Sequence, residues 1–484
     1  MRRGTPRFRL HACEAAVEEL QARIPFRFGD GAIRRVPTLL VRAEIEAAGK
    51  KRAAGLSAEC LLPGRAEGDT AAAYRRQVEE AILAFRTARE VFLEAGSRAT
   101  AAHELWESAC PRAVEKGMLA GLDAATCVAG SSLLERAAVD AVSRLKGLSL
   151  HEMLRQDLLG MRTSKAVPEE PVSEFSFRHT IGVLDPLTVN EIPPAARVAD
   201  SIPQALEEHI ESYGFRSFKV ELSGEAERDL ERLTRLAVLL DQRCRGGYRV
   251  ALDGRERFRD AAPLEGLLEA LKTRPYGPEF LSSIQHFEGL FPRGAALEPA
   301  IADEVSRISK WAPVVVDDEG DTLDFVERAV ELGYRGFAHS NRRGLFRSLQ
   351  ARASIVRARG KSGGPSLFQT GEDAASPPIV GFQQELAALS ALGLSACGSN
   401  AHQFFHGLDH IPTAEATAAL VDHADLYEQR GKSVFIRIEE GRIAARSIHA
   451  AGFGYSCQIA FAERTPLEAW SASRVGPEPN PEGP

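Results

Sequence analysis

The 484-residue sequence has no apolar stretch that approaches the length of a bilayer span, and no apolar signal core follows its basic N-terminus. It also has no surplus of positive charge, because its formal net charge is -7 and its pI is about 6.0. These absences argue against a membrane-spanning protein and a secretory signal. They also make nucleic acid and anionic membranes poor candidates as partners.

Cysteine is scarce as well. The chain has seven cysteines, and none of them forms a Cys-x-x-Cys pair. An odd number without such pairs argues against a disulfide framework and against a zinc site. We therefore expect a cytoplasmic protein with free thiols.

Short apolar runs that end in an acidic residue are the most informative feature that is present. Asp253, Glu288 and Asp317 each follow such a run directly. The runs alternate with long amphipathic stretches, a pattern typical of parallel strands alternating with helices. Candidate strands end near Lys219, Asp253, Glu288, Asp317 and His339. We therefore expect an α/β fold with a (β/α)₇₋₈ barrel, similar to a TIM barrel, over residues 170–413.

The regions on either side of this barrel have other patterns. Residues 1–165 combine a candidate strand at 36–45 with candidate helices at 71–93 and 131–155, which indicates an α+β domain. Residues 414–429 are expected to form a helix, and 433–438 an antiparallel strand, in a C-terminal segment that extends to residue 473. The proline-rich tail, 474–484, is expected to be disordered.

The three acidic residues predict a metal site. Strand ends that carry carboxylates meet at the C-terminal edge of a parallel sheet, where α/β proteins hold their active sites. Carboxylates that converge there repel one another and need a cation, and oxygen ligands with room for water suit Mg²⁺. Solvated strand ends or helix N-caps are the simpler explanation. We predict that Asp253, Glu288 and Asp317 bind Mg²⁺, with Glu319 as the alternative on the third strand.

Several segments, taken in order, resemble the mandelate racemase/muconate lactonizing enzyme branch of the enolase superfamily. They are Ile24–Gly29, Leu133–Ala141, Phe218–Glu221, the three acidic strand ends, and Asn400–His402. The resemblance implies that residues 1–165 form a capping domain, which the C-terminal segment completes. It also implies that the metal binds the carboxylate of a small acid while a base removes the neighbouring proton.

The acid/base residues of that family are altered in this sequence. Glu221 replaces the second Lys of the Lys-x-Lys motif, and no Lys follows the strand that ends at His339. The remaining catalytic candidates are His339, Glu221 and Lys219. We expect His339 to be the better base, since a nearby metal and Lys219 would lower the pKa of Glu221.

Three further residues are candidates for substrate binding: His402, Glu372 and Asn400. His402, His406 and His410 are spaced four residues apart, as in a three-His metal site on one helix. Gly407 and Pro412 interrupt that helix, so we do not predict such a site there.

The resemblance therefore implies a Mg²⁺-dependent lyase, such as an acid-sugar dehydratase, or an isomerase, such as a racemase or epimerase. Its substrate would be a small hydroxy or sugar acid, and the protein is expected to be a homo-oligomer. The alternative is an altered relative that binds metal and an acid without turnover.

Overall fold

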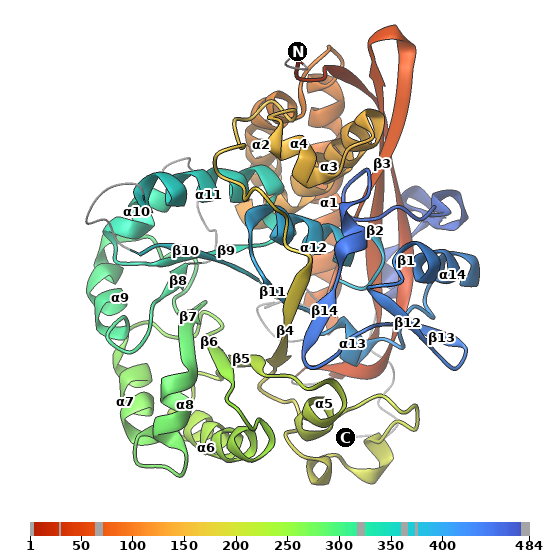
Figure 1. Ribbon diagram of the computed structural model, residues 1–484. Helices are drawn as coiled ribbons and strands as arrows, with labels where there is room; N and C mark the ends of the chain where they lie inside the picture. The colour runs from red at the N-terminus through yellow and green to blue at the C-terminus, as the bar shows by residue number, and fades with distance from the viewer. Residues whose placement is uncertain are drawn as a thin grey trace.

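The computed structural model describes residues 4–28, 31–62, 71–316, 325–359, 366–372 and 376–475 (Figure 1). Asp317, Glu319 and residues 476–484 lie outside these ranges. The expected start of the disordered tail at 474 is wrong, because Arg474 ends the 3₁₀ helix Ala472–Arg474 and Val475 is buried. None of the helices in the described ranges is long and apolar enough to cross a membrane.

The N-terminal region is an antiparallel sheet covered by helices. Its strands lie in the order β15-β1-β2-β3. Their bounds are β1 Phe8–Phe28, β2 Gly31–Ala47, β3 Lys51–Cys60 and β15 Thr465–Pro466. The helices are α1 Ala71–Ala95, α2 Ala102–Leu119, α3 Ala124–Lys146 and α4 Leu150–Arg155. Since β15 pairs with β1, the C-terminal segment adds a strand to this sheet.

Helix α3 is the centre of this region. It packs so closely on β3 that a Cβ at Gly55 would lie 2.2 Å from the backbone nitrogen of Ala141. The single helix expected over residues 131–155 is wrong. The chain leaves α3 at Gly147, which has a left-handed conformation with a φ of 65°, and α4 begins afterwards at Leu150. Glycine adopts this conformation without steric cost, so it ends the helix.

Eight short parallel strands follow: β4 Glu174–Ile181, β5 Ser217–Glu221, β6 Arg249–Asp253, β7 Ile284–Glu288, β8 Val315–Val316, β9 Gly336–His339, β10 Phe368–Gly371 and β11 Ala396–Gly398. They form two ladders, β11-β4-β5-β6-β7 and β10-β9-β8. Helices cover the outside of the strands (Figure 1): α5 Leu206–Tyr213, α6 Ala226–Arg243, α7 Ala262–Leu271, α8 Gly277–Ser283, α9 Ala302–Ile308, α10 Phe325–Glu331, α11 Leu345–Arg359 and α12 Val380–Leu392.

This topology confirms an α/β fold but not a closed barrel. An isolated bridge between Phe287 and Val314 links the two ladders on one side. On the other side, no ladder joins β10 to β11 in the part of the chain that the structure describes. The strand order is nevertheless the one that an eight-stranded barrel would have.

The last part of the chain departs from the sequence prediction. After α13 Ala401–Phe404, helix α14 Thr413–Asp422 is shorter than expected, and residues 427–430 form a strand. This strand, β12 Tyr427–Arg430, pairs with β13 Ser433–Ile436, while β14 Arg442–Ala444 pairs with β4. Tyr427 is buried, and its hydroxyl donates to Gln383, so tertiary packing overrides the local helical pattern.

A buried carboxylate joins α3 to two distant segments. Asp140 is fully buried and accepts hydrogen bonds from the backbone of Leu56 at 2.9 Å and of Phe453 at 2.8 Å. It also accepts from the hydroxyl of Tyr455 at 2.7 Å and pairs with Arg144 at 2.9 Å. Asp140 therefore holds β3 and the C-terminal segment against α3.

We expect Asp140→Asn to lower the free energy of unfolding by about 3–5 kcal/mol, because an amide has one acceptor oxygen and leaves buried donors and Arg144 without their partner. Urea unfolding would measure this loss. Asp123→Asn is the matched control on the same helix. Asp123 is the N-cap of α3, and Asn caps a helix about as well. Equal stability of both variants would contradict this role for Asp140.

Candidate active site

Two of the three predicted metal ligands lie side by side. Asp253 ends β6 and Glu288 ends β7, and they are register partners in the parallel ladder. Each is 2% exposed. Glu221 ends the preceding strand, β5, and is the register partner of Asp253. Three acidic residues therefore end three consecutive strands at one edge of the sheet, while Asp317 lies outside the described residues.

Lys219 bridges the two carboxylates. Its Nζ lies 3.1 Å from Oδ2 of Asp253 and 3.0 Å from Oε1 of Glu288. The other oxygen of Asp253 accepts a hydrogen bond of 2.7 Å from the backbone of Arg255. The Nε2 atom of His286 lies 3.4 Å from Oε2 of Glu288. An ammonium group is therefore already in contact with both predicted metal ligands.

The charges around Glu288 favour its ionised form. Burial alone would raise the pKa of this carboxyl, but the positive charges of Lys219 and Arg178 and the contact with His286 more than reverse this effect. Its pKa is therefore held well below its usual range. The site keeps a negative charge on Glu288 at neutral pH, as a cation ligand requires.

The sequence prediction overlooked Arg178, which lies on β4. It is 4% exposed, and its Nη2 donates a hydrogen bond of 2.6 Å to the carbonyl of Gly371 on β10. The available signal was an arginine in the middle of a strand between aromatic and β-branched residues, since buried Arg is rare unless it is paired. Arg178 and Lys219 together supply positive charge beside Glu288.

Glu221 has a different environment from the one expected. Its Oε2 accepts a hydrogen bond of 3.0 Å from Nη1 of Arg255, and 21% of its side chain is exposed. Burial, followed by the charge of Asp253, outweighs the effects of Arg255 and Lys219 and raises the pKa of Glu221. Lys219 does lower this pKa, as expected, but burial has the larger effect, and the expected effect of a metal stays a prediction. A raised pKa suits a carboxylate base.

His339 points away from this group of residues. Its Nδ1 lies 2.6 Å from the hydroxyl of Ser348 on α11, and its Nε2 lies 3.3 Å from Glu385 on α12. Side chains alternate along a strand. Phe337, on the same face of β9 as His339, packs against Phe325 of the outer helix α10. His339 therefore lies between the sheet and its covering helices, contrary to the expectation that it lies beside the carboxylates.

Glu372 and Asn400 both lie at strand ends but have structural partners. Glu372 follows β10, and its Oε2 lies 3.8 Å from Nη2 of Arg343. The side-chain amide of Asn400 donates to the carbonyl of Thr180 at 3.0 Å and accepts from its N–H at 3.2 Å. Both polar groups of Asn400 therefore extend the edge of β4.

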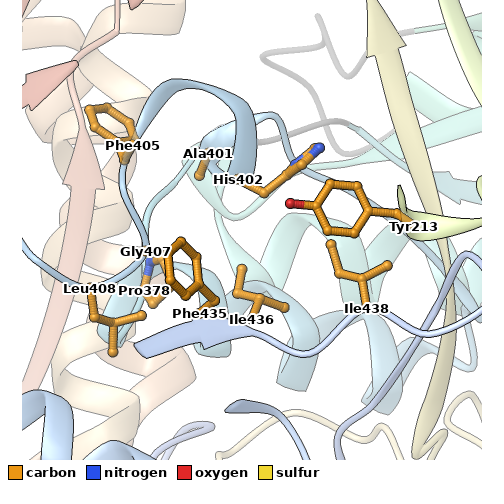
Figure 2. Close-up of a pocket in the computed structure, with 10 residues that line it drawn as sticks. All are labelled: Tyr213, Pro378, Ala401, His402, Phe405, Gly407, Leu408, Phe435, Ile436 and Ile438. Carbon is orange, nitrogen blue, oxygen red and sulfur yellow. The ribbon is translucent and has the colours of Figure 1, made fainter. Parts of the chain in front are cut away.

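His402, His406 and His410 do not share a helix face, because α13 ends at Phe404. His406 pairs with Asp409, and Nε2 of His410 donates to the carbonyl of Pro378 at 3.0 Å. His402 lies at one end of a small cavity (Figure 2). The cavity is lined by Tyr213, Pro378, Ala401, His402, Phe405, Gly407, Leu408, Phe435, Ile436 and Ile438.

His410 predicts a loss of stability in acid. Burial lowers the pKa of its imidazole from 6.5 to about 4. Above pH 6.5, the pKa of this imidazole in the unfolded chain, His410 is neutral in both states and the free energy of unfolding is at its full value. As the pH falls from 6.5 to 4, only the unfolded chain binds the proton, so the free energy of unfolding decreases. This loss is about 3 kcal/mol. We expect His410→Gln to reduce this loss of stability in acid by about that amount, measured by urea unfolding over a series of pH values. An unchanged pH profile for His410→Gln would contradict this prediction.

Comparisons with known proteins identify the fold. No family model matches the sequence, and no curated protein matches it. Solved structures do match. An enolase from Bradyrhizobium complexed with magnesium and mandelic acid has a TM-score of 0.57 at 14% identity, over 95% of this chain and 99% of that one.

Two further matches have similar values. The muconate lactonizing enzyme from Pseudomonas fluorescens complexed with muconolactone has a TM-score of 0.55 at 13% identity, over 93% of this chain and 97% of that one. A mandelate racemase/muconate lactonizing protein from Herpetosiphon aurantiacus has a TM-score of 0.56 at 16% identity, over 93% and 99%. The chain has the fold of the mandelate racemase/muconate lactonizing enzyme type of the enolase superfamily. This confirms the structural side of the resemblance, and at such low identity the likeness concerns the fold.

Proposed function

We propose that this protein is a Mg²⁺-dependent enzyme that removes the α-proton of a small carboxylic acid. The observation that carries this proposal is the convergence of Lys219, Asp253 and Glu288 at neighbouring strand ends, with Nζ within 3.1 Å of both carboxylates. A solved structure of the same fold, complexed with magnesium and mandelic acid, supports the choice of metal and substrate class.

The residues present fit a hard cation. Both oxygens of Glu288 are buried, and apart from the ammonium of Lys219, 3.0 Å from Oε1, they accept no hydrogen bond of good geometry from the described part of the chain. Oxygen ligands of this kind suit Mg²⁺. Asp253 and Glu288 would hold it, and Asp317 is proposed as the third ligand. Bound there, Mg²⁺ supplies positive charge beside the substrate carboxylate, which makes the neighbouring C–H group more acidic.

Glu221 is the proposed base, in place of His339. It shares a strand face with Lys219 and is the register partner of Asp253, so its carboxylate faces the same space as the proposed ligands. The hydrogen bond from Arg255 orients it. Its raised pKa brings it closer to the neutral range in which a general base is most effective.

Lys219 and Arg178 are proposed to orient the acid. Their positive charges flank Glu288, where the carboxylate of a substrate would approach. Once Glu221 has taken the proton, the product depends on the substrate. Return of this proton from Glu221 to a β-hydroxyl group lets that group leave as water and gives dehydration. Delivery of a proton from solvent water to the other face gives racemisation or epimerisation and leaves Glu221 to release its proton to solvent. A hydroxy or sugar acid would allow either outcome.

A second candidate is a relative that binds an acid without turnover. The bridging position of Lys219 favours it, because an ammonium already balances the charge of Asp253 and Glu288. In that case the carboxylates would be structural, and Mg²⁺ would add nothing to the stability of the protein.

Deuterium exchange tests these two candidates. The protein is incubated in D₂O with millimolar Mg²⁺ and a library of hydroxy and sugar acids, and mass spectrometry follows deuterium at the α-carbon. We expect exchange with at least one acid, abolished by EDTA and by Glu288→Gln. Thermal unfolding with and without Mg²⁺ provides a second readout that needs no substrate. Absence of both exchange and a Mg²⁺-dependent rise in melting temperature would refute the metal enzyme.

A further inference from the structure

Three histidines from distant parts of the chain meet on the outer face of β4. His179 lies on β4, His209 on α5 and His402 on α13. Each offers one ring nitrogen, and these three atoms all lie within 4.8 Å of one another. Arg178, the neighbour of His179, faces the carboxylates, so alternation along the strand places the histidines on the opposite face of the sheet.

The ring nitrogens of this cluster are unusually free of partners. Within the described residues, Nδ1 of His179, both nitrogens of His209 and Nε2 of His402 are buried and have no hydrogen-bond partner. A buried polar atom without a partner costs about 1–3 kcal/mol. Four such atoms in one cluster indicate a bound ligand that is not part of the protein chain.

His402 is held in the tautomer that a metal ligand needs. Its Nδ1 donates a hydrogen bond of 2.9 Å to the carbonyl of Ser399. Nε2 is thereby left with its lone pair. Metal-binding histidines commonly donate their second ring nitrogen to a backbone carbonyl in this way, which fixes the ring and the tautomer.

We propose that His179, His209 and His402 form a binding site for a transition-metal ion of the Zn²⁺ class. Imidazole nitrogens suit Zn²⁺, Co²⁺, Ni²⁺ and Cu²⁺, whereas Mg²⁺ prefers oxygen. Three histidines around a tetrahedral ion at about 2.0–2.1 Å would have ring centroids about 5 Å apart. The observed separations are 4.6, 5.3 and 5.4 Å. The ring centroids are therefore spaced as such an ion requires, and the ring nitrogens, which lie within 4.8 Å of one another, would close to about 3.3 Å around the ion.

The surroundings are suited to neutral ligands. Phe177, Phe215 and Tyr213 enclose the cluster, with ring centroids 5.1–5.6 Å from that of His402. Burial lowers the pKa of all three histidines, to about 4 for His402, so each ring is neutral at neutral pH and has one nitrogen with a free lone pair. The nearby Arg23 is neutralised by Asp200, to which its Nη2 donates at 2.8 Å.

The cluster borders a cavity through one of its members. His402 and Tyr213 lie together at one end of the cavity in Figure 2 and line it, whereas His179 and His209 do not. A fourth ligand, such as water or a small anion, would approach the ion from the side of His402. The simpler explanation is a stack of histidines in an aromatic core. Such a stack would leave the convergent nitrogens unsatisfied, and the metal would satisfy them.

Cobalt and zinc binding to the full chain test the site. The protein is freed of metal with a chelator and titrated with Co²⁺ and then Zn²⁺. The bound metal is counted by mass spectrometry, and the visible spectrum reports the geometry of Co²⁺. We expect about one ion per chain, a tetrahedral Co²⁺ spectrum that Zn²⁺ abolishes, and a higher melting temperature with Zn²⁺. Absence of stoichiometric binding by the parent protein would overturn the proposal.

Variants assign the ligands. His209→Phe and His402→Asn are each expected to weaken Zn²⁺ binding by at least about 100-fold, since even loss of an outer-shell partner costs 10- to 100-fold. His406→Gln is the control from the same segment, and Glu288→Gln is the control for the carboxylate site. Both controls should retain the ion. If His209→Phe fails to fold, His402→Asn decides, because His402 is only partly buried. Binding that survives in His402→Asn would refute the site.

Discussion

Glu221→Gln is expected to reduce the rate of α-deuterium exchange by about 100- to 10,000-fold, the usual contribution of a general base. Gln keeps the size of the side chain and can still accept the hydrogen bond that Arg255 donates to Oε2. Only the ability to take a proton is lost. Mass spectrometry of the acid recovered from D₂O measures the effect.

His339→Asn is the matched comparison. His339 is buried between β9, α11 and α12, so the variant should lower the melting temperature while exchange per folded molecule stays within a few-fold of the parent value. The reverse outcome, in which Glu221→Gln retains exchange and His339→Asn abolishes it, would reject Glu221 as the base. An equal loss of deuterium exchange in both variants would indicate a structural effect and would also reject Glu221 as the base.

The convergence of the carboxylates could be predicted from the sequence because it depends on local patterns. An apolar run that ends in Asp or Glu marks the end of a strand, and parallel strands end at the same edge. The structure accordingly has β6 ending at Asp253 and β7 ending at Glu288, and they are paired in register. The contacts of Lys219 follow from the same logic, since it lies two residues before the end of β5.

The sequence could not show which side chains of a fully buried strand face the carboxylates and which face the covering helices. All four residues of β9 are buried, so the strand has no polar side that would indicate which residues face inward. Strands of parallel sheets are covered on both faces and appear as continuous apolar runs. The position of His339 at a strand end was therefore foreseeable, but the direction of its side chain was not.

The histidine cluster shows a second limit. The spacing of His402, His406 and His410 drew attention to one helix face, but α13 is only four residues long. The residues that do meet, His179, His209 and His402, belong to β4, α5 and α13. Their approach depends on how α5 packs on the sheet, which is a long-range contact and leaves no periodic pattern in the sequence.

Lys219→Met is expected to lower the free energy of unfolding by about 3–5 kcal/mol in EDTA at neutral pH. Removal of one partner from a buried ion pair leaves uncompensated charge, and here two carboxylates lose the same ammonium. If Asp253 and Glu288 also bind Mg²⁺, millimolar Mg²⁺ should restore much of the lost stability, because the ion replaces the missing positive charge and binds only the folded chain. Thermal and urea unfolding with and without Mg²⁺ would measure both effects.

The double variant Lys219→Met/Glu288→Gln distinguishes instability caused by unbalanced carboxylate charge from instability caused by altered packing at position 219. It removes one carboxylate together with the ammonium, so it should be more stable in EDTA than Lys219→Met alone and should gain little from Mg²⁺. A single variant that is equally unstable with and without Mg²⁺ would mean that Lys219 is the only cation this site accepts, and would favour the non-catalytic candidate. Rescue of Lys219→Met by Mg²⁺, but not of the double variant, would identify Glu288 as a metal ligand without requiring a substrate.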